Sequence, residues 1–163
     1  MFLALTSNKK NWSKDDDLIL LGDWCEEGNN LDGINYNVIK NQRHDSHDKI
    51  IIEQKYIIDF YFEIIPLLSS KLNLIHDTKK SDKYWEYLIG PWLWNFLVIF
   101  HDRYSCINQA MLEYPEIHTN ISFNNYFHLR YADFEQEFQS EEYNFYIFSE
   151  IIKNINSKFK INK

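Results

Sequence analysis

The chain has 163 residues, of which 45% are hydrophobic and 17% aromatic, and its formal net charge is −7. This length predicts one domain over residues 1–163. Its negative charge excludes nucleic acid as a partner, because a nucleic-acid backbone requires a basic face. Cys25 and Cys106 match neither a metal-site nor a disulfide spacing, and the N-terminus lacks the pattern of a signal peptide. We therefore expect a cytoplasmic protein.

Three short apolar runs predict the strands of a small sheet. Phe2 to Thr6 is short and apolar, and Leu18 to Leu21 is a continuous apolar run. A strand that is buried on both faces of a parallel sheet has this composition. Tyr36 to Lys40 is a candidate third strand. We therefore expect an α/β fold with a small parallel sheet of about three strands and several long helices.

The residues after the second predicted strand are candidates for a binding site. Gly22 ends this strand and places Asp23 and Trp24 at its carboxyl end, where ligands of open α/β sheets bind. Asp23 is alternatively a turn residue or a helix cap. We expect Cys25 to be a small buried residue rather than a nucleophile, because no general base is identifiable beside it.

The densest cluster of titratable residues, residues 41–48, follows the third predicted strand. In such a loop His44 could act as a general base or contact an anionic group. On a helical turn, His44 and His47 would share a face and could bind a metal. The simplest interpretation is a polar loop whose Ser46 or Asp45 caps the next helix. We predict no metal site here.

Helical spacing then continues over two long stretches. The first runs from about Asp48 to Ile75, and Pro66 within it should kink or divide the helix. The second contains an apolar run over residues 88–100, which is too short for a membrane span of about 20 residues. Because Pro91 disfavours helix at the residue before it, we expect one helix up to about Ile89, a kink, and another from Pro91.

Arg103 continues the apolar stripe of this last helix, which should extend to about Met111. Its stem could pack while its head reaches water, or a buried guanidinium could hold a carboxylate or phosphate. Beyond the helix we expect an irregular link over residues 118–127, short amphipathic helices over 132–138 and 141–155, and a polar tail. The second of these helices should bury Phe145, Phe148, Ile152 and Ile155 on one face.

Several of these segments occur together, and in this order, in one bacterial family. The sequence resembles the transferases encoded with surface-polysaccharide genes, in O-antigen or capsule clusters. In that family the early loop often reads His-Trp-Asp and the acid before Trp24 is often Glu, whereas this chain lacks the Trp and has Asp23. The motifs that carry the resemblance are Phe2-Leu-Ala-Leu-Thr6, Leu21-Gly-Asp-Trp-Cys25, the loop around His44, Tyr84-Trp85, Gly90-Pro-Trp-Leu93, Asp102-Arg-Tyr104 and Ser149-Glu-Ile-Ile152.

The resemblance implies that this chain is the N-terminal portion of a longer protein, because the family members are much longer. By analogy with two-lobed sugar transferases, this portion would meet a carbohydrate acceptor, while the missing C-terminal half, its partner, would bind the nucleotide-sugar donor. No cofactor is expected in this chain. The main hypothesis is a glycosyltransferase-like enzyme of surface-carbohydrate biosynthesis.

In this hypothesis the catalytic residues are His44, as base or orienter, and Asp23, which lies near it if the second and third strands are parallel neighbours. Arg43 or Arg103 would steady an anionic group. The expected substrate contacts are Trp24, Arg43, Asp45 and Arg103. The alternative hypothesis is a non-catalytic interaction or packing module, or a truncated gene product, marked by an exposed apolar patch to which the helix over residues 141–155 contributes.

Overall fold

The computed structural model describes residues 1–40, 46–123, 134–155 and 160–162. The chain divides into two compact units, one formed by Met1–Asn41 and Arg103–Lys163 and the other by Gln42–Asp102. Helix α2 (Asp82–Glu113) contributes its first part to the second unit and its last part to the first. That the chain is one domain of a longer protein stays a prediction.

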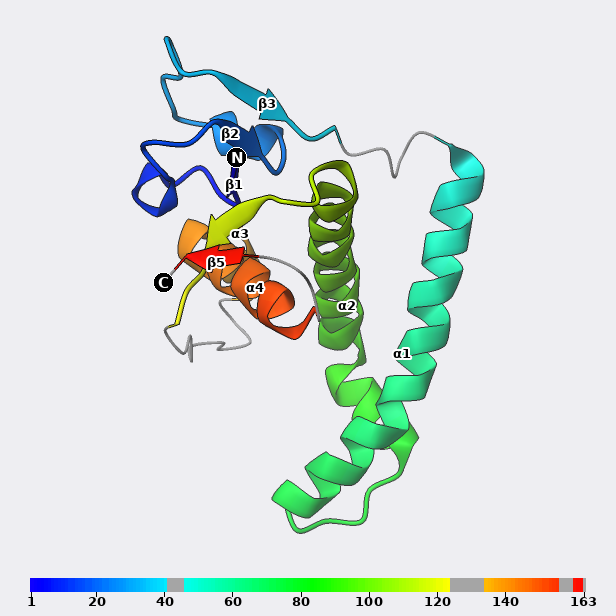
Figure 1. The fold of residues 1–163 in the computed structure, drawn as a ribbon. Coiled ribbons are helices and arrows are strands. Elements are labelled where there is room, and N and C mark those ends of the chain that lie inside the picture. Colours follow the sequence, from blue (N-terminus) through cyan, green and yellow to red (C-terminus); the bar gives the residue numbers. More distant parts are fainter. Residues whose placement is uncertain (41–45, 124–133, 156–159, 163) are drawn as a thin grey trace. The chain divides into compact units, whose positions relative to one another are not determined.

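The first unit contains a parallel sheet with the strand order β3-β2-β1-β4-β5 (Figure 1). The expected α/β fold is therefore confirmed, and each of the three predicted strands is present. Two further strands that we did not expect, β4 and β5, lie on the side of β1 opposite β2. The strands are β1 (Phe2–Ala4), β2 (Leu18–Leu20), β3 (Tyr36–Val38), β4 (His118–Asn120) and β5 (Lys160–Asn162).

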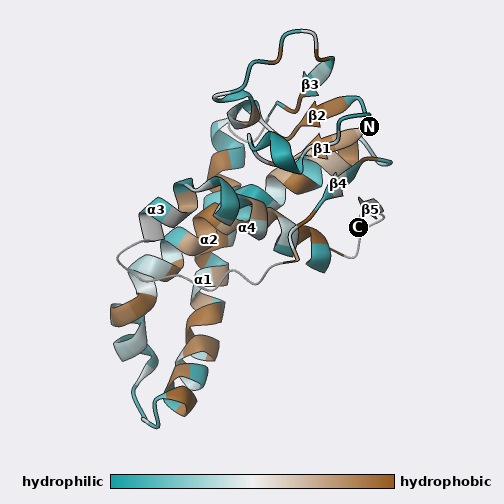
Figure 2. Cartoon of the chain, turned by 90° about the vertical axis from the view of Figure 1, so that its left-hand side faces the viewer, coloured by the Kyte–Doolittle hydropathy of each residue, from teal (hydrophilic) through white to brown (hydrophobic). Residues whose placement is uncertain are grey.

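Strands β1 and β2 form the hydrophobic centre of the sheet. Every residue of both strands is buried, and Phe2 pairs with Leu18 while Ala4 pairs with Leu20. Both strands are coloured as hydrophobic in Figure 2. This confirms that a continuous apolar run, rather than an alternating one, marks a strand covered on both faces.

Strand β4 lies where we expected an irregular link. It pairs with β1 through Phe2 and His118, and the Thr119 hydroxyl donates a hydrogen bond of 2.7 Å to the Leu3 carbonyl. Thr119 is buried, whereas the two other residues of the strand are half-buried. A polar three-residue strand of this kind is held by its hydrogen bonds and carries no apolar pattern in the sequence.

Helices α3 (Phe134–Gln139) and α4 (Glu141–Asn154) complete the first unit, with the short 3-10 helices η1 (Lys9–Asn11) and η2 (Asp23–Glu26). The Ser140 side chain caps α4 by accepting from the backbone N–H of Tyr143 at 3.1 Å. Phe148 and Ile152 are buried as expected, but Phe145 and Ile155 are only half-buried. The proposal that α4 forms an exposed apolar patch was wrong, because its apolar face includes the buried residues Tyr143, Ile147, Phe148, Ile151 and Ile152.

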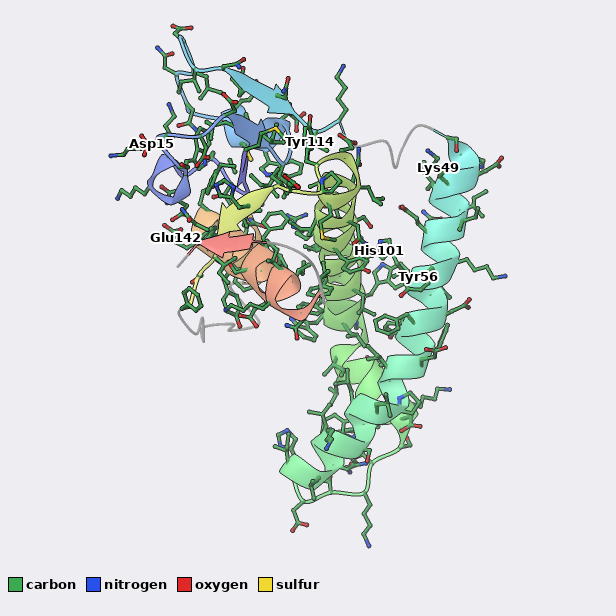
Figure 3. The ribbon with its side chains drawn as sticks, in the orientation of Figure 1. Asp15, Lys49, Tyr56, His101, Tyr114 and Glu142 are labelled. Carbon is green, nitrogen blue, oxygen red and sulfur yellow. The ribbon has the colours of Figure 1, made fainter. Side chains whose placement is uncertain are left out.

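The second unit consists of α1 (His47–Ile75) and the first part of α2. Its core is a cluster of four buried aliphatic side chains, and the partly buried residues packed against this cluster are Tyr61, Ile64, Leu68, Trp92 and Phe96. Further along, the rings of Tyr56 and His101 approach each other with centroids 5.5 Å apart (Figure 3). No helix within the described residues is long and apolar enough to cross a membrane. The core cluster consists of Ile57, Ile65, Leu93 and Leu97.

Both helices of the second unit continue through a proline. We expected Pro91 to separate two helices, which was wrong, and α1 likewise is not divided at Pro66. A proline within a helix removes one backbone hydrogen bond and crowds the preceding turn. Both helices are packed near their prolines, since Ile65 and Leu93 are buried in the core of the unit.

A single side chain organises the turn between α1 and α2. The Asn73 Oδ1 atom accepts hydrogen bonds from the Thr78 hydroxyl, the Lys80 backbone N–H and the Trp85 indole, at 2.9, 2.9 and 3.0 Å. Its amide nitrogen donates to the Lys80 carbonyl at 2.8 Å. The Asn73 side chain therefore links the end of α1 to the connecting turn and to the first part of α2 through four hydrogen bonds.

Candidate functional site

The strand order places a topological switch point between β1 and β4. From β1 the chain proceeds outward to β2 and β3, and returns to the other side of β1 as β4. The segments that follow β1 and β4 therefore leave the sheet on opposite sides of the switch point, and ligands of open parallel sheets bind at such a position. The candidate site is this edge, formed by the segments after β1, β2 and β4 and by the first turn of α4.

The segment after β1 is held rigidly by three side chains. Three successive carbonyls accept a hydrogen bond from a side chain that comes later in the sequence. A loop with all of these carbonyls satisfied loses little conformational entropy when a ligand binds. The bonds run from the Trp24 indole to the Leu5 carbonyl (3.2 Å), from the Trp12 indole to the Thr6 carbonyl (2.8 Å), and from the Asn29 amide to the Ser7 carbonyl (2.7 Å).

The Thr6 hydroxyl is the unsatisfied polar group of this segment. Thr6 is only 2% exposed, and its Oγ1 atom has no hydrogen-bond partner among the described residues. A buried hydroxyl without a partner costs about 1–3 kcal/mol. The hydroxyl is enclosed beyond the carboxyl end of the central strand, so this cost is borne by the folded segment itself and the group is not exposed to a ligand.

Trp24, an expected substrate contact, has a defined packing role. In addition to its bond to the Leu5 carbonyl, its ring lies directly over Gly22, where a Cβ atom would collide with the ring. The glycine is therefore required for the approach of the indole. Trp24 is half-buried, and its contact with a substrate stays a prediction.

Asp23 and Cys25 follow β2 in opposite environments. Asp23 is exposed at the start of η2, so its carboxylate is accessible at the sheet edge. Cys25 is completely buried, and burial raises the pKa of its thiol to about 12. Its sulfur lies 3.4 Å from the Ala4 carbonyl oxygen, to which it donates. The expectation that Cys25 is a small buried residue is confirmed.

A carboxylate from the distant part of the chain also reaches this edge. The Glu141 Oε2 atom accepts a hydrogen bond of 3.2 Å from the backbone N–H of Asn8. Glu141 is the first residue of α4, where the helix dipole favours negative charge. On the same helix, the Ser149 hydroxyl accepts from the backbone N–H of Ser122, after β4, at 2.8 Å. Helix α4 thereby connects the two segments that border the switch point.

The Arg103 guanidinium binds an amide side chain. Its Nη2 and Nε atoms lie 3.0 and 3.3 Å from the Asn144 Oδ1 atom, and the Asn144 amide donates to the carbonyls of Phe138 and Ser140. Arg103 is half-buried. It therefore fixes the end of α3 and the start of α4 to α2, and its role toward an anionic group stays a prediction.

The other predicted site residues, Arg43, His44 and Asp45, lie outside the described residues. Their strand does satisfy the condition on which their role depended, because β2 and β3 are parallel neighbours with Leu20 paired to Val38. The described residues directly after β2 and β3, Asp23 among them, therefore leave the same edge of the sheet. Within the described part of the chain, no three His, Cys, Asp or Glu side chains converge as metal ligands.

Comparison with protein families identifies the family of this chain. A family model described as LIC12162 family transferase matches residues 1–163. The chain belongs to the LIC12162 transferase family. No curated protein and no solved structure matches this family member. The expected transferase relationship is thus confirmed at the level of the family, and its carbohydrate substrates remain a proposal.

Sequence reasoning missed several groups at this edge of the LIC12162 family chain. Thr6 was recognised only as the end of a strand, and Asn29 only as part of a loop. Glu141 was recognised only as a helix start, although Ser140 followed by two acidic residues is a typical helix N-terminus. Its contact with Asn8 spans 133 residues, so no local pattern in the sequence indicates it.

Proposed function

We propose that this transferase family chain is the N-terminal, acceptor-side portion of a glycosyltransferase-like enzyme of bacterial surface-carbohydrate biosynthesis. The observation that supports the proposal is the parallel strand order, which brings the segments after β1, β2 and β3, including the exposed Asp23, to one edge of a sheet with a switch point. The carboxylate of Asp23 and the imidazole proposed for His44 match the hydrogen-bonding needs of a sugar.

In the proposed reaction, His44 accepts the proton of an acceptor hydroxyl, and Asp23 orients the acceptor or the imidazole. The acceptor oxygen forms a bond to the anomeric carbon of a nucleotide sugar, while the bond from that carbon to the phosphate oxygen breaks. The nucleoside diphosphate leaves with that electron pair. Arg43 steadies the developing negative charge, and the C-terminal half of the protein supplies the donor site.

Thermal-shift measurements with the purified chain test the acceptor-side assignment. We expect neutral oligosaccharides to raise the melting temperature, because a ligand that binds only the folded state stabilises it. Asp23→Asn and His44→Ala should reduce this shift. Asp32→Asn, which changes another exposed acid after β2, should not.

Thr6→Val is a further control at this edge, because it replaces the enclosed, unpartnered hydroxyl by a methyl group of similar size. The apoprotein should keep its stability, and the ligand-induced shift should be unchanged. In contrast, Thr119→Val removes a satisfied hydroxyl and should destabilise the apoprotein. Stabilisation by nucleotide sugars alone, abolished by Asp23→Asn, would place the donor site in this portion and contradict the proposal.

A second candidate function is a non-catalytic interaction module. Many large apolar side chains of the second unit are exposed, and such surface often marks a protein–protein contact. Failure of all oligosaccharides and nucleotide sugars to stabilise the chain would favour this function. The most exposed of these side chains are Ile52, Phe62, Leu67, Leu74, Ile75 and Tyr87.

A further inference from the structure

A cavity of about 860 Å³ lies within the second unit, between the middle of α1 and the first half of α2. Its volume is within the range of small-molecule sites, about 300–1,000 Å³. It opens to solvent and has more apolar than polar lining. The lining residues are Tyr61, Lys83, Glu86, Tyr87, Gly90, Pro91 and Trp94.

Three aromatic rings form the apolar part of this cavity. Tyr61 of α1 meets Trp94 of α2 edge to face, with ring centroids 6.0 Å apart. Tyr87 is 87% exposed, so its ring is available to a ligand. Aromatic rings with one polar end suit ligands that are apolar on one face and hydrated at the edge.

The polar groups of the cavity carry both signs of charge. Glu86 supplies a carboxylate and Lys83 an ammonium group, so a strongly charged ligand of either sign meets a like charge. Together with the Tyr61 hydroxyl they provide both donors and acceptors. This combination favours a neutral ligand that carries several hydroxyl groups.

The Gly90-Pro91 pair shapes the wall of the cavity. A Cβ atom on Gly90 would lie 2.6 Å from the Tyr61 Oη atom, so the glycine allows the phenol to reach the backbone of α2. Partial burial and the nearby Glu86 raise the pKa of Tyr61, which keeps its hydroxyl a hydrogen-bond donor. Pro91 lacks an N–H, so it cannot donate the helical bond to the Tyr87 carbonyl, which leaves this acceptor available.

We propose that this cavity is a binding site for a neutral pyranose ring, as part of an oligosaccharide. The C–H face of the sugar lies on Tyr87 and Trp94, while its hydroxyl groups bond to Glu86, Lys83 and Tyr61. The volume accommodates more than one sugar ring. The inference rests on the lining of the second unit and does not depend on the proposed transfer reaction or on the sheet edge.

Saturation-transfer NMR with the whole chain and no donor tests this site directly. The probes are methyl glycosides and trisaccharides of glucose, galactose, mannose and N-acetylglucosamine. We expect a dissociation constant on the order of millimolar, as for a small solvent-exposed site. Saturation of the aromatic protons should transfer most strongly to the C–H protons on one face of the sugar. Sorbitol, which has the hydroxyl groups without a ring, should show little transfer.

Matched variants assign the signal to the cavity. Tyr87→Ala and Trp94→Ala should each weaken binding at least about fivefold. Because Tyr87 is highly exposed, Tyr87→Ala should leave the stability of the fold unchanged. Gly90→Ala should weaken binding while every ring is retained, because the Tyr61 phenol must move. Tyr104→Ala is the control, since Tyr104 is an exposed tyrosine of α2 outside the cavity.

Three outcomes would overturn the proposal. They are the absence of transfer to any of the sugars, equal transfer in the wild type and in both ring variants, and stronger binding of uridine or choline than of the sugars. Asp23→Asn should leave this signal unchanged. A loss of signal in Asp23→Asn but not in Tyr87→Ala would locate the sugar at the sheet edge, which would support the proposed function and contradict this inference.

Discussion

The Glu141 carboxylate accepts a hydrogen bond from the backbone N–H of Asn8 at 3.2 Å, although the two residues are 133 positions apart. This bond joins the segment after the central strand β1 to the first turn of α4. Asn8 also caps η1 by accepting from the backbone N–H of Lys10. This hydrogen bond thus joins an N-terminal and a C-terminal segment of the first unit at the candidate site.

Removal of this contact should measurably destabilise the first unit. We expect Glu141→Ala to lower the free energy of unfolding by about 1 kcal/mol more than Glu142→Ala, because only Glu141 satisfies a backbone N–H of another segment. Both variants remove a negative charge from the same helix terminus, so the difference between them isolates the contact with Asn8. Glu142 is exposed on the same turn (Figure 3). Urea unfolding measures both values, and equal losses would contradict the role assigned to Glu141.

The stability of the first unit should depend on pH through Asp16. The Ser13 hydroxyl and then His118 lower the pKa of the Asp16 carboxyl, with contacts of 2.5 and 3.1 Å to the Oδ2 atom. A carboxyl with a lower pKa in the folded state stabilises the fold above its ordinary pKa of 3.8, and this contribution is lost as the pH falls through the folded value.

Asp16→Asn should therefore be less stable than the wild type at neutral pH, and the difference should shrink below pH 3.8. Thermal unfolding of both proteins between neutral pH and pH values below 3.8 measures this difference in stability. Asp15→Asn, at the exposed neighbouring position (Figure 3), is the matched control. A wild-type advantage that does not change with pH would show that Asp16 acts through packing rather than through its charge.

The buried thiols should be unreactive while the protein is folded. Burial raises the pKa of Cys25 to about 12, and Cys106 is also buried. In a Cys106→Ala variant, a thiol reagent at mildly alkaline pH should therefore label Cys25 only as fast as the fold opens. Added denaturant should increase the labelling rate in proportion to the unfolded population. Rapid labelling of Cys25 in the native protein would instead reveal an accessible nucleophile at the sheet edge.

The accuracy of the sequence-based predictions followed the strength of the local signal. The apolar runs at β1 and β2 and the helical spacing of α1 were sufficient to predict those elements and the α/β class. Strand β4 has the sequence His118-Thr119-Asn120 and is stabilised by its position beside β1, which no local pattern records. The expected break before Pro91 was wrong, because α2 continues through this residue, and the packing of the surrounding side chains is visible only in the structure.

The candidate site shows the same division. Asp23 was predicted from its position after a buried strand, and it does lie exposed at the carboxyl edge. Asn144, the partner of Arg103, is 41 residues away, and the partner of Glu141 is 133 residues away. Such contacts depend on the order of the strands and on the position of α4, so sequence spacing alone could not provide them.

The turn between α1 and α2 contains a residue in a strained backbone conformation. Asp77 has a φ of 49°, in the left-handed region that non-glycine residues avoid, and it directly follows the C-cap residue of α1, His76. The Thr78 N–H bonds to the Asn73 carbonyl at 2.9 Å, which is the hydrogen bond of a helix C-terminus that normally ends in glycine. The hydrogen bonds of the turn thus hold Asp77 in the left-handed conformation, which costs conformational free energy.

We therefore expect Asp77→Gly to be more stable than Asp77→Ala by about 1 kcal/mol, because glycine adopts this conformation without a Cβ clash. Alanine removes the carboxylate but keeps the clash, so the comparison separates conformational strain from charge. Thermal unfolding followed by far-UV circular dichroism measures the difference. If Asp77→Ala were as stable as Asp77→Gly, the left-handed conformation at this turn would carry no strain, and the stability of the turn would depend on the hydrogen bonds of Asn73 alone.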